Sequence, residues 1–245
     1  MTTKYQNPPI VEAVCEFKFF SEGQNDSIIP GMLFTKFSKE FPIVKKKNLG
    51  LVIPVDENER EKDLVFNPLT QFFNEENTKI IQVGKDLLTI NCVNKYPHWE
   101  NYKPLILKVF DEYISLANPT GIKRLGIRAI NKISIPSEDL NLKDYFSFSP
   151  VSPFKDDNKL AAFILHIERS FFDDRDRLIM KNMTIVPEKE AHTSFLFDLD
   201  YVMKKATGLN FSEVSDWLEI AHNTLNDAFE ISITDKLRDT FGKIQ

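Results

Sequence analysis

The chain has little cysteine and little glycine. Its 245 residues include two cysteines, Cys15 and Cys92, each inside an apolar run that is typical of a strand. Two cysteines without metal-ligand spacing indicate buried, reduced thiols and exclude both a disulfide framework and a cysteine-rich zinc site. With eight glycines, the sequence contains no P-loop, Gly-x-Gly-x-x-Gly or Gly-x-Ser-x-Gly motif. The common nucleotide-binding and hydrolase signatures are therefore missing.

The chain also lacks an excess of positive charge. It has 31 Lys and Arg against 36 Asp and Glu, a net charge of −5. A protein that coats DNA or RNA usually carries a broad basic field, so a global nucleic-acid surface is excluded and a local basic patch stays open. The first nine residues have no apolar leader, and no apolar run approaches the length of a membrane span. We expect a cytoplasmic location and no membrane contact.

Phenylalanine is abundant, with 21 copies, and 42% of the residues are hydrophobic. Period-two alternation predicts strands, and spacings of three and four predict helices. The predicted strands are residues 10–20, 49–55, 64–73, 79–83, 87–93, 122–135, 160–172, 177–186 and 193–203. The predicted helices are residues 31–41, a long helix that begins near Tyr102, a short helix or turn in 137–148, a long helix capped by Ser212, and a last helix from 235 to 241. Residues 56–63 and 149–158 are expected to be loops.

The order of these elements predicts an α+β protein made of two related halves. Each half contains a strand, a short helix, several strands and a long helix. We therefore expect two halves of mainly antiparallel sheet, built as two sheets or as one continuous sheet, with each half packed on one long helix. Residues 1–120 and 121–245 are the N-terminal and C-terminal halves, packed as one unit.

The strand at residues 123–132 carries the main cationic pattern. Period two places Arg124, Arg128 and Lys132 on one face, with Gly126 leaving space between the two arginines. Such a row of cations suits a phosphate or the carboxylates of a partner. The alternative is a solvated strand face paired with acidic neighbours, which is the more frequent meaning of such a pattern.

Three further residues are candidates for binding. Asn131 lies in the same strand as Arg128 but on the opposite face of an ideal strand. His222 and Glu230 lie two turns apart in the last long helix and are placed to line a groove. The alternative for His222 is an ordinary histidine on a helix surface.

Several short motifs point to chemistry but lack essential parts. His166-Ile167-Glu168 lacks the Cys-x-x-Cys of a zinc deaminase. Glu16-Phe17-Lys18 resembles half of a metal-dependent nuclease site, but no Asp precedes it in residues 1–9. Asp173, Asp174 and Asp176 lack the glycine and glutamate of a calcium loop and are predicted to form an exposed turn. We predict no cofactor and no metal.

Several segments together resemble one protein family. They are Asn7–Phe17 (NPPIVEAVCEF), Tyr96–Tyr102 (YPHWENY), Arg124–Ile133 (RLGIRAINKI), Asp198–Asp200 with Ala221–His222, and Phe229–Leu237 (FEISITDKL). In this order the chain resembles a sporadically distributed, functionally uncharacterised family of prokaryotic proteins of about this length. The family's patchy distribution resembles that of horizontally moved genes such as toxin–antitoxin or phage-defence components, which is an association and not a physical argument.

The sequence favours a non-enzymatic protein-interaction module, antitoxin-like or associated with phage defence, that binds a partner protein encoded nearby. The acidic charge suits a basic partner. The alternatives are a nucleic-acid or nucleotide binder that uses residues 123–132, and a metal-dependent nuclease. A homodimer formed through edge strands is also open.

Overall fold

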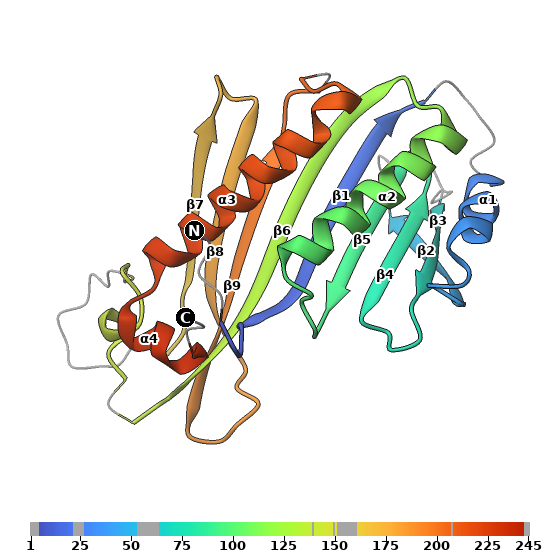
Figure 1. Cartoon of the computed structure of the whole chain (residues 1–245). Coiled ribbons are helices and arrows are strands. Elements are labelled where there is room, and N and C mark those ends of the chain that lie inside the picture. The colour runs from blue at the N-terminus through green and yellow to red at the C-terminus, as the bar shows by residue number, and fades with distance from the viewer. Residues whose placement is uncertain are drawn as a thin grey trace, which may run out of the picture.

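A computed structural model gives the fold of the chain (Figure 1) and describes residues 5–21, 27–52, 64–138, 140–148, 150, 161–206 and 208–242. Within these residues, nine strands form one antiparallel sheet in the order β2-β3-β4-β5-β1-β6-β9-β8-β7. The strands are β1 (Ile10–Phe20), β2 (Ile43–Val52), β3 (Leu64–Phe73), β4 (Lys79–Gly84), β5 (Leu87–Val93), β6 (Gly121–Pro136), β7 (Ile164–Phe171), β8 (Asp176–Ile185) and β9 (His192–Met203).

The described helices are α1 (Ile29–Phe37), α2 (Trp99–Ala117), α3 (Val214–Ser232) and α4 (Asp235–Phe241), with short 3-10 turns at Leu142–Asp144 and Phe211–Glu213. Figure 1 shows α2 and α3 crossing the same face of the sheet. No helix of the described residues is long and apolar enough to cross a membrane.

The predicted arrangement of two sheet halves, each packed on one long helix, is wrong. The α+β composition is confirmed, but β1 and β6 pair along almost their whole length, from Ile10↔Asn131 to Phe20↔Gly121, and this ladder joins everything into a single sheet. In β1 the residues Ala13, Cys15, Phe17 and Phe19 are buried in alternation, and the register with β6 places them beside Ala129, Ile127, Leu125 and Ile122, so the apolar residues of the two strands share the core face. The division of the chain at residues 120 and 121 stays a prediction.

The hydrophobic core lies between the sheet and the helices. On β1, Phe17 and Phe19 stack on Phe110 of α2, with ring centroids 4.9 and 6.3 Å apart. Farther along the same face, Trp217 of α3 packs on Tyr201 of β9, with ring centroids 5.5 Å apart. Large aromatic side chains bury much apolar area each, so this layer supplies most of the driving force that holds the helices to the sheet.

A buried carboxylate also ties α3 to the sheet. Asp176 at the start of β8 is fully buried and accepts hydrogen bonds from Arg175, from the Tyr201 hydroxyl at 3.2 Å and from Trp217 Nε1 at 3.1 Å. The sequence predicted an exposed turn here. The turn at residues 172–175 is confirmed, but the prediction was wrong for Asp176, whose carboxylate is compensated by Arg175 and two neutral donors.

The helix boundaries differ from the prediction at several ends. The helix predicted for residues 31–41 is α1, which ends at Phe37. The helix predicted to begin near Tyr102 is α2, which begins earlier, at Trp99; Pro104 lies inside it, so α2 lacks the one intrahelical hydrogen bond that this residue would donate. Ser212 is not the cap of α3; Asn210 and Glu213 form a capping box around the preceding 3-10 turn.

Other predicted elements agree with the structure or lie outside it. Thr234 caps α4 and Gly242 ends it. Lys45, Lys46 and Lys47 lie within β2, which begins earlier than predicted. The predicted loop 56–63 and most of the loop 149–158 lie outside the described residues, as does the end of the strand predicted for 49–55. Both cysteines are buried and free.

Candidate functional site

The structure places the six predicted binding residues on two opposite faces of the sheet. Asn131, His222 and Glu230 come together on the helix-covered face, where they line one pocket. Arg124, Arg128 and Lys132 point from β6 to the other face, which no described helix covers and which we call the open face. The predicted opposition of Arg128 and Asn131 across the sheet is confirmed.

On the open face, each of the three predicted cations has a carboxylate partner. Arg128 forms a two-pronged pair with Asp198 of β9, both bonds 2.6 Å long. Arg124 pairs with Glu16 of β1 and lies 3.7 Å from Asp200, and Lys132 pairs with Glu188. The two arginines therefore pair with acids from neighbouring strands, and Lys132 pairs with an acid in the loop between β8 and β9, which is the alternative that the sequence pattern left open.

The titration of this network follows from its geometry. The hydrogen bonds to Asp198 raise the pKa of Arg128, so the guanidinium stays charged. Burial raises the pKa of Asp200, although Arg124 and Arg128 both act to lower it. Asp198 is only 5% exposed, so its charge depends on Arg128 for compensation.

Amide side chains continue the open face toward β3. Gln71 donates to Gln82 at 2.6 Å, Gln82 donates to Asn91 at 2.9 Å, and Asn91 donates to Glu12 at 2.7 Å. The row crosses four neighbouring strands, β3, β4, β5 and β1. Polar side chains on this face thus satisfy one another, as expected of a sheet face without a second layer.

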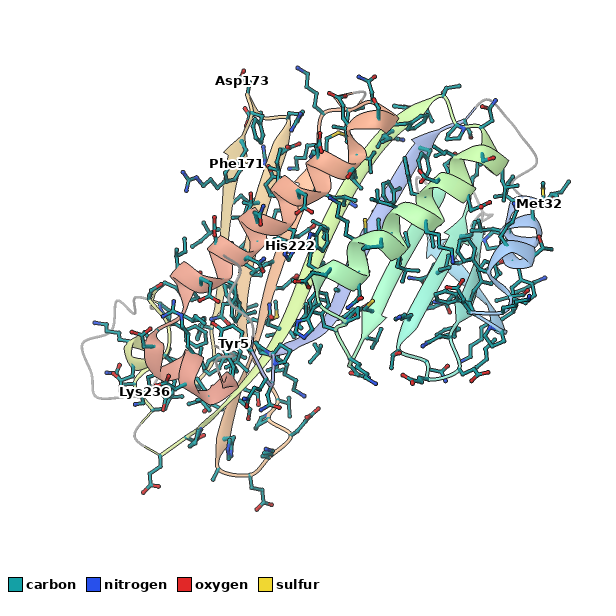
Figure 2. The ribbon with its side chains drawn as sticks, viewed as in Figure 1. Tyr5, Met32, Phe171, Asp173, His222 and Lys236 are labelled. Atoms are coloured by element: carbon teal, nitrogen blue, oxygen red, sulfur yellow. The ribbon has the colours of Figure 1, made fainter. Side chains whose placement is uncertain are left out.

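On the covered face, a pocket of about 140 Å³ lies where α2, α3 and the N-terminal segment meet over β6 and β9. We call it the seam pocket. Its lining residues are Tyr5, Pro8, Pro9, Ile10, Tyr96, His98, Trp99, Glu100, Ala129, Asn131, Leu199, His222, Leu225, Asn226, Phe229 and Glu230. Figure 2 shows His222 near the middle of α3, and Tyr5 close to the C-terminal part of that helix.

Trp99 and His222 form the wall where α2 meets α3. Their rings are stacked, with centroids 4.1 Å apart and planes within 7° of parallel. Trp99 Nε1 donates to Glu219 of α3 at 3.1 Å, and Lys103 of α2 donates to the other oxygen of the same carboxylate at 2.8 Å. These contacts fix the spacing of the two helices and so the width of the pocket.

His222 is buried, with 8% of its surface exposed, so the alternative of a helix-surface histidine is wrong. Burial lowers the pKa of His222 to about 4, although Glu219 and Glu100 act to raise it. The ring is therefore neutral at pH 7. The Asn226 Nδ2 group lies 2.8 Å from His222 Nε2, and an amide nitrogen donates, which assigns the ring proton to Nδ1.

Asn131 forms part of the floor of the pocket. It is 5% exposed, and its amide nitrogen donates to the carbonyl oxygen of Phe197 at 3.1 Å. Within the described residues, its side-chain oxygen accepts no hydrogen bond. This oxygen is not among the fully enclosed atoms that lack a partner, so it faces the pocket.

Glu230 shapes the pocket and is already paired. Its carboxylate accepts from the Tyr5 hydroxyl at 2.7 Å and from Arg238 Nε at 2.8 Å. Burial and the bond to Glu230 raise the pKa of Tyr5, so Tyr5 remains a donor. Glu230 thereby holds the N-terminal segment against α3.

Sequence reasoning missed the loop that precedes α2. Tyr96 and His98 of this loop and Trp99, the first residue of α2, all line the pocket. His98 has φ 62° and ψ 160°, a conformation that is costly for any residue other than glycine. The sequence contains a usable signal, because the segment Tyr96–Tyr102 places four aromatic rings in seven residues at the start of a helix.

The motifs for metal chemistry find no support from their surroundings. Glu16 is bonded to Arg124, and Lys18 Nζ lies 3.9 Å from the same carboxylate. His166 and Glu168 are paired with each other on β7. Among the described residues there is no group of three or more His, Cys, Asp or Glu arranged to hold a metal ion.

Neither a scan against protein-family models nor a search of curated proteins found a match for this chain. The resemblance to the sporadically distributed prokaryotic family therefore stays a prediction.

Proposed function

We propose that the chain is a non-enzymatic interaction module that binds a partner protein at the seam pocket. The observation that carries this proposal is the pair of buried polar side chains, Asn131 and His222, on the lining of a pocket with aromatic walls. Binding energy at protein interfaces concentrates in such desolvated pockets, which take one anchoring side chain of the partner.

The pocket is better suited to recognition than to catalysis. A histidine with a pKa of about 4 is a weak base at neutral pH, because general bases work best near the operating pH. The carboxylate of Glu230 is occupied by Tyr5 and Arg238. The described residues that line the pocket include no serine, threonine or cysteine that would act as a nucleophile.

The net charge of −5 favours encounter with a basic partner. The antitoxin-like or defence-associated role, and a partner encoded nearby, belong to this proposal through the family resemblance. On the open face, the cations of residues 123–132 are paired with acids, so no observation there favours the nucleic-acid alternative.

The test compares two neighbouring residues on opposite faces of β6. The tagged full chain is used to capture partners from its source cells, and each captured protein is then purified and titrated against variants by calorimetry. We expect Asn131→Leu to weaken binding at least about tenfold, since one buried hydrogen bond is lost. Lys132→Gln is the matched control, because its partner Glu188 is exposed, and it should change affinity by less than about twofold.

The reverse pattern would contradict the proposal. If Lys132→Gln weakens binding and Asn131→Leu does not, the open face is the binding surface. If the captured material is RNA or DNA whose affinity falls steeply with salt, the nucleic-acid alternative replaces the protein-partner proposal.

A further inference from the structure

We infer that the seam pocket binds the phenol ring of a tyrosine side chain presented by the partner protein. This inference rests on the proposed function and names the chemistry of the group that enters the pocket. It combines the size of the pocket, its aromatic walls, its two buried hydrogen-bonding atoms and its charges.

The size of the pocket suits one six-membered ring. Its volume is about 140 Å³, and an apolar protein cavity of about 150 Å³ is known to hold benzene. Tyr96, Trp99 and Phe229 supply ring surfaces from two segments of the chain, the one that leads into α2 and the C-terminal part of α3. Aromatic rings pack favourably against one another at edge or offset geometries, so a ring is a better occupant than an aliphatic chain of equal volume.

The two buried polar groups of the pocket require opposite hydrogen-bonding partners. The side-chain oxygen of Asn131 is an acceptor, and the proton on His222 Nδ1 makes that atom a donor. A phenol hydroxyl donates one hydrogen bond and accepts others, so it has the chemistry to pair with either group. Phenylalanine offers neither function, and a buried polar atom left without a partner costs affinity.

The charges around the pocket disfavour an ionic occupant. Two of the three nearby carboxylates, those of Glu219 and Glu230, are already paired with Lys103 and Arg238, so these two offer a cation little further stabilisation. His222 remains neutral because burial penalises positive charge at this position. An anion would meet the acidic side chains of Glu100 and Glu230 on the lining. A neutral polar ring avoids both penalties.

The first experiment uses the unmodified full chain and three small probes of nearly equal shape. We would titrate p-cresol, 4-methylanisole and toluene, and follow backbone amide shifts by NMR. p-Cresol donates and accepts, 4-methylanisole only accepts, and toluene does neither. We expect p-cresol to bind at least about tenfold more tightly than either other probe, since each loses the bond to Asn131. Equal affinities, or shifts confined to residues outside the pocket, would overturn the inference.

Variants then test the two polar contacts. Asn131→Leu and His222→Phe keep the approximate shape of the side chains, and phenylalanine keeps a ring stacked on Trp99. Each should weaken p-cresol about tenfold while leaving toluene nearly unchanged. Asn182→Leu is the matched control, because Asn182 on β8 is an equally buried asparagine that does not line the pocket. A variant that fails to fold leaves the probe series on the unmodified chain as the deciding result.

The same measurements separate this inference from the proposed function. If the partner binds in an Asn131-dependent manner but p-cresol shows no preference and does not displace it, the tyrosine inference fails and the interaction module stands. If p-cresol binds preferentially but Asn131→Leu leaves partner binding intact, the pocket recognises phenols and the proposed partner site is wrong. Displacement of the partner by excess p-cresol supports both.

Discussion

Polar side chains on the two faces of β6 differ in whether the chain supplies their hydrogen-bond partners. On the open face, Arg128 is bound to Asp198, whose carboxylate is 5% exposed, and the neighbouring cations are paired in turn. On the covered face, Asn131 is just as buried, yet its side-chain oxygen has no partner within the described residues. The charged groups of the open face are paired within the chain, and the covered face leaves hydrogen-bonding capacity beside a pocket.

The difference shows that a buried polar side chain without a hydrogen-bond partner indicates a binding site only where it lies beside a cavity. Asn182 and Ser194 are also buried without a hydrogen-bond partner, and neither lines the seam pocket. An unpaired buried polar group costs about 1–3 kcal/mol wherever it lies. Among these described residues, Asn131 and His222 line the seam pocket, where another molecule can form hydrogen bonds with them and offset that cost.

The largest expected effect belongs to the open face. Replacing Arg128 with alanine leaves Asp198 buried without its counter-charge, and we expect the free energy of unfolding to fall by about 3 kcal/mol. Urea denaturation would show this as a lower midpoint with an unchanged slope. The double variant Arg128→Met with Asp198→Leu should recover much of the loss. If Arg128→Ala loses partner binding while its stability is unchanged, the open face is the binding surface and the seam pocket is not.

The next largest effect on stability is expected from His222 in the seam pocket. His222 is neutral in the folded chain down to a pKa of about 4, whereas its unfolded value is 6.5, so the unfolded chain binds more protons between these values. Stability from this group is full above pH 6.5 and is lost as the pH falls toward 4, by roughly 3 kcal/mol in total. Urea denaturation at pH 7, 6 and 5 measures this fall in the free energy of unfolding.

His222→Phe is the control for the pH series. It keeps a ring on Trp99 and removes the titrating group, so its stability should decline less steeply than that of the unmodified chain over the same range. Identical slopes in the two proteins would show that the His222 environment does not resist protonation.

The smallest effect concerns the amide row of the open face. Gln82→Ala removes the bonds from Gln71 and to Asn91, and we expect a loss of about 1 kcal/mol. Thermal denaturation would detect it. A loss as large as that for Arg128→Ala would mean that amides and ion pairs contribute equally, so that charge is not what distinguishes the open face.

Much of the fold follows from local pattern. Alternation in residues 122–135 correctly predicts which side chains of β6 face the core, and the apolar stripes correctly locate α2 and α3. The sequence left open whether the halves share one sheet, because that depends on the pairing of β1 with β6, more than one hundred residues apart. Local periodicity specifies which face of a strand is buried but not which strand lies beside it.

The candidate site was predictable in part. His222, Glu230 and Asn131 were singled out and line one pocket, but nothing in the sequence shows that they meet. The acids that neutralise Arg124 and Arg128 lie on other strands, Glu16 on β1 and Asp198 on β9, so a cationic pattern in one strand could not reveal its own compensation. Asp176 illustrates the same point, since its burial depends on Trp217 of α3.

The N-terminal segment has a consequence for biosynthesis. Gln6 and Asn7 donate backbone hydrogen bonds to Gly242 and Phe241, and the Tyr5 hydroxyl binds Glu230, so one wall of the seam pocket comes from the first residues and another from the last helices. Closing so long a loop is entropically costly and comes late. A chain still emerging from the ribosome therefore has no seam pocket, and binding at the pocket reports that α3 and α4 have been synthesised and docked.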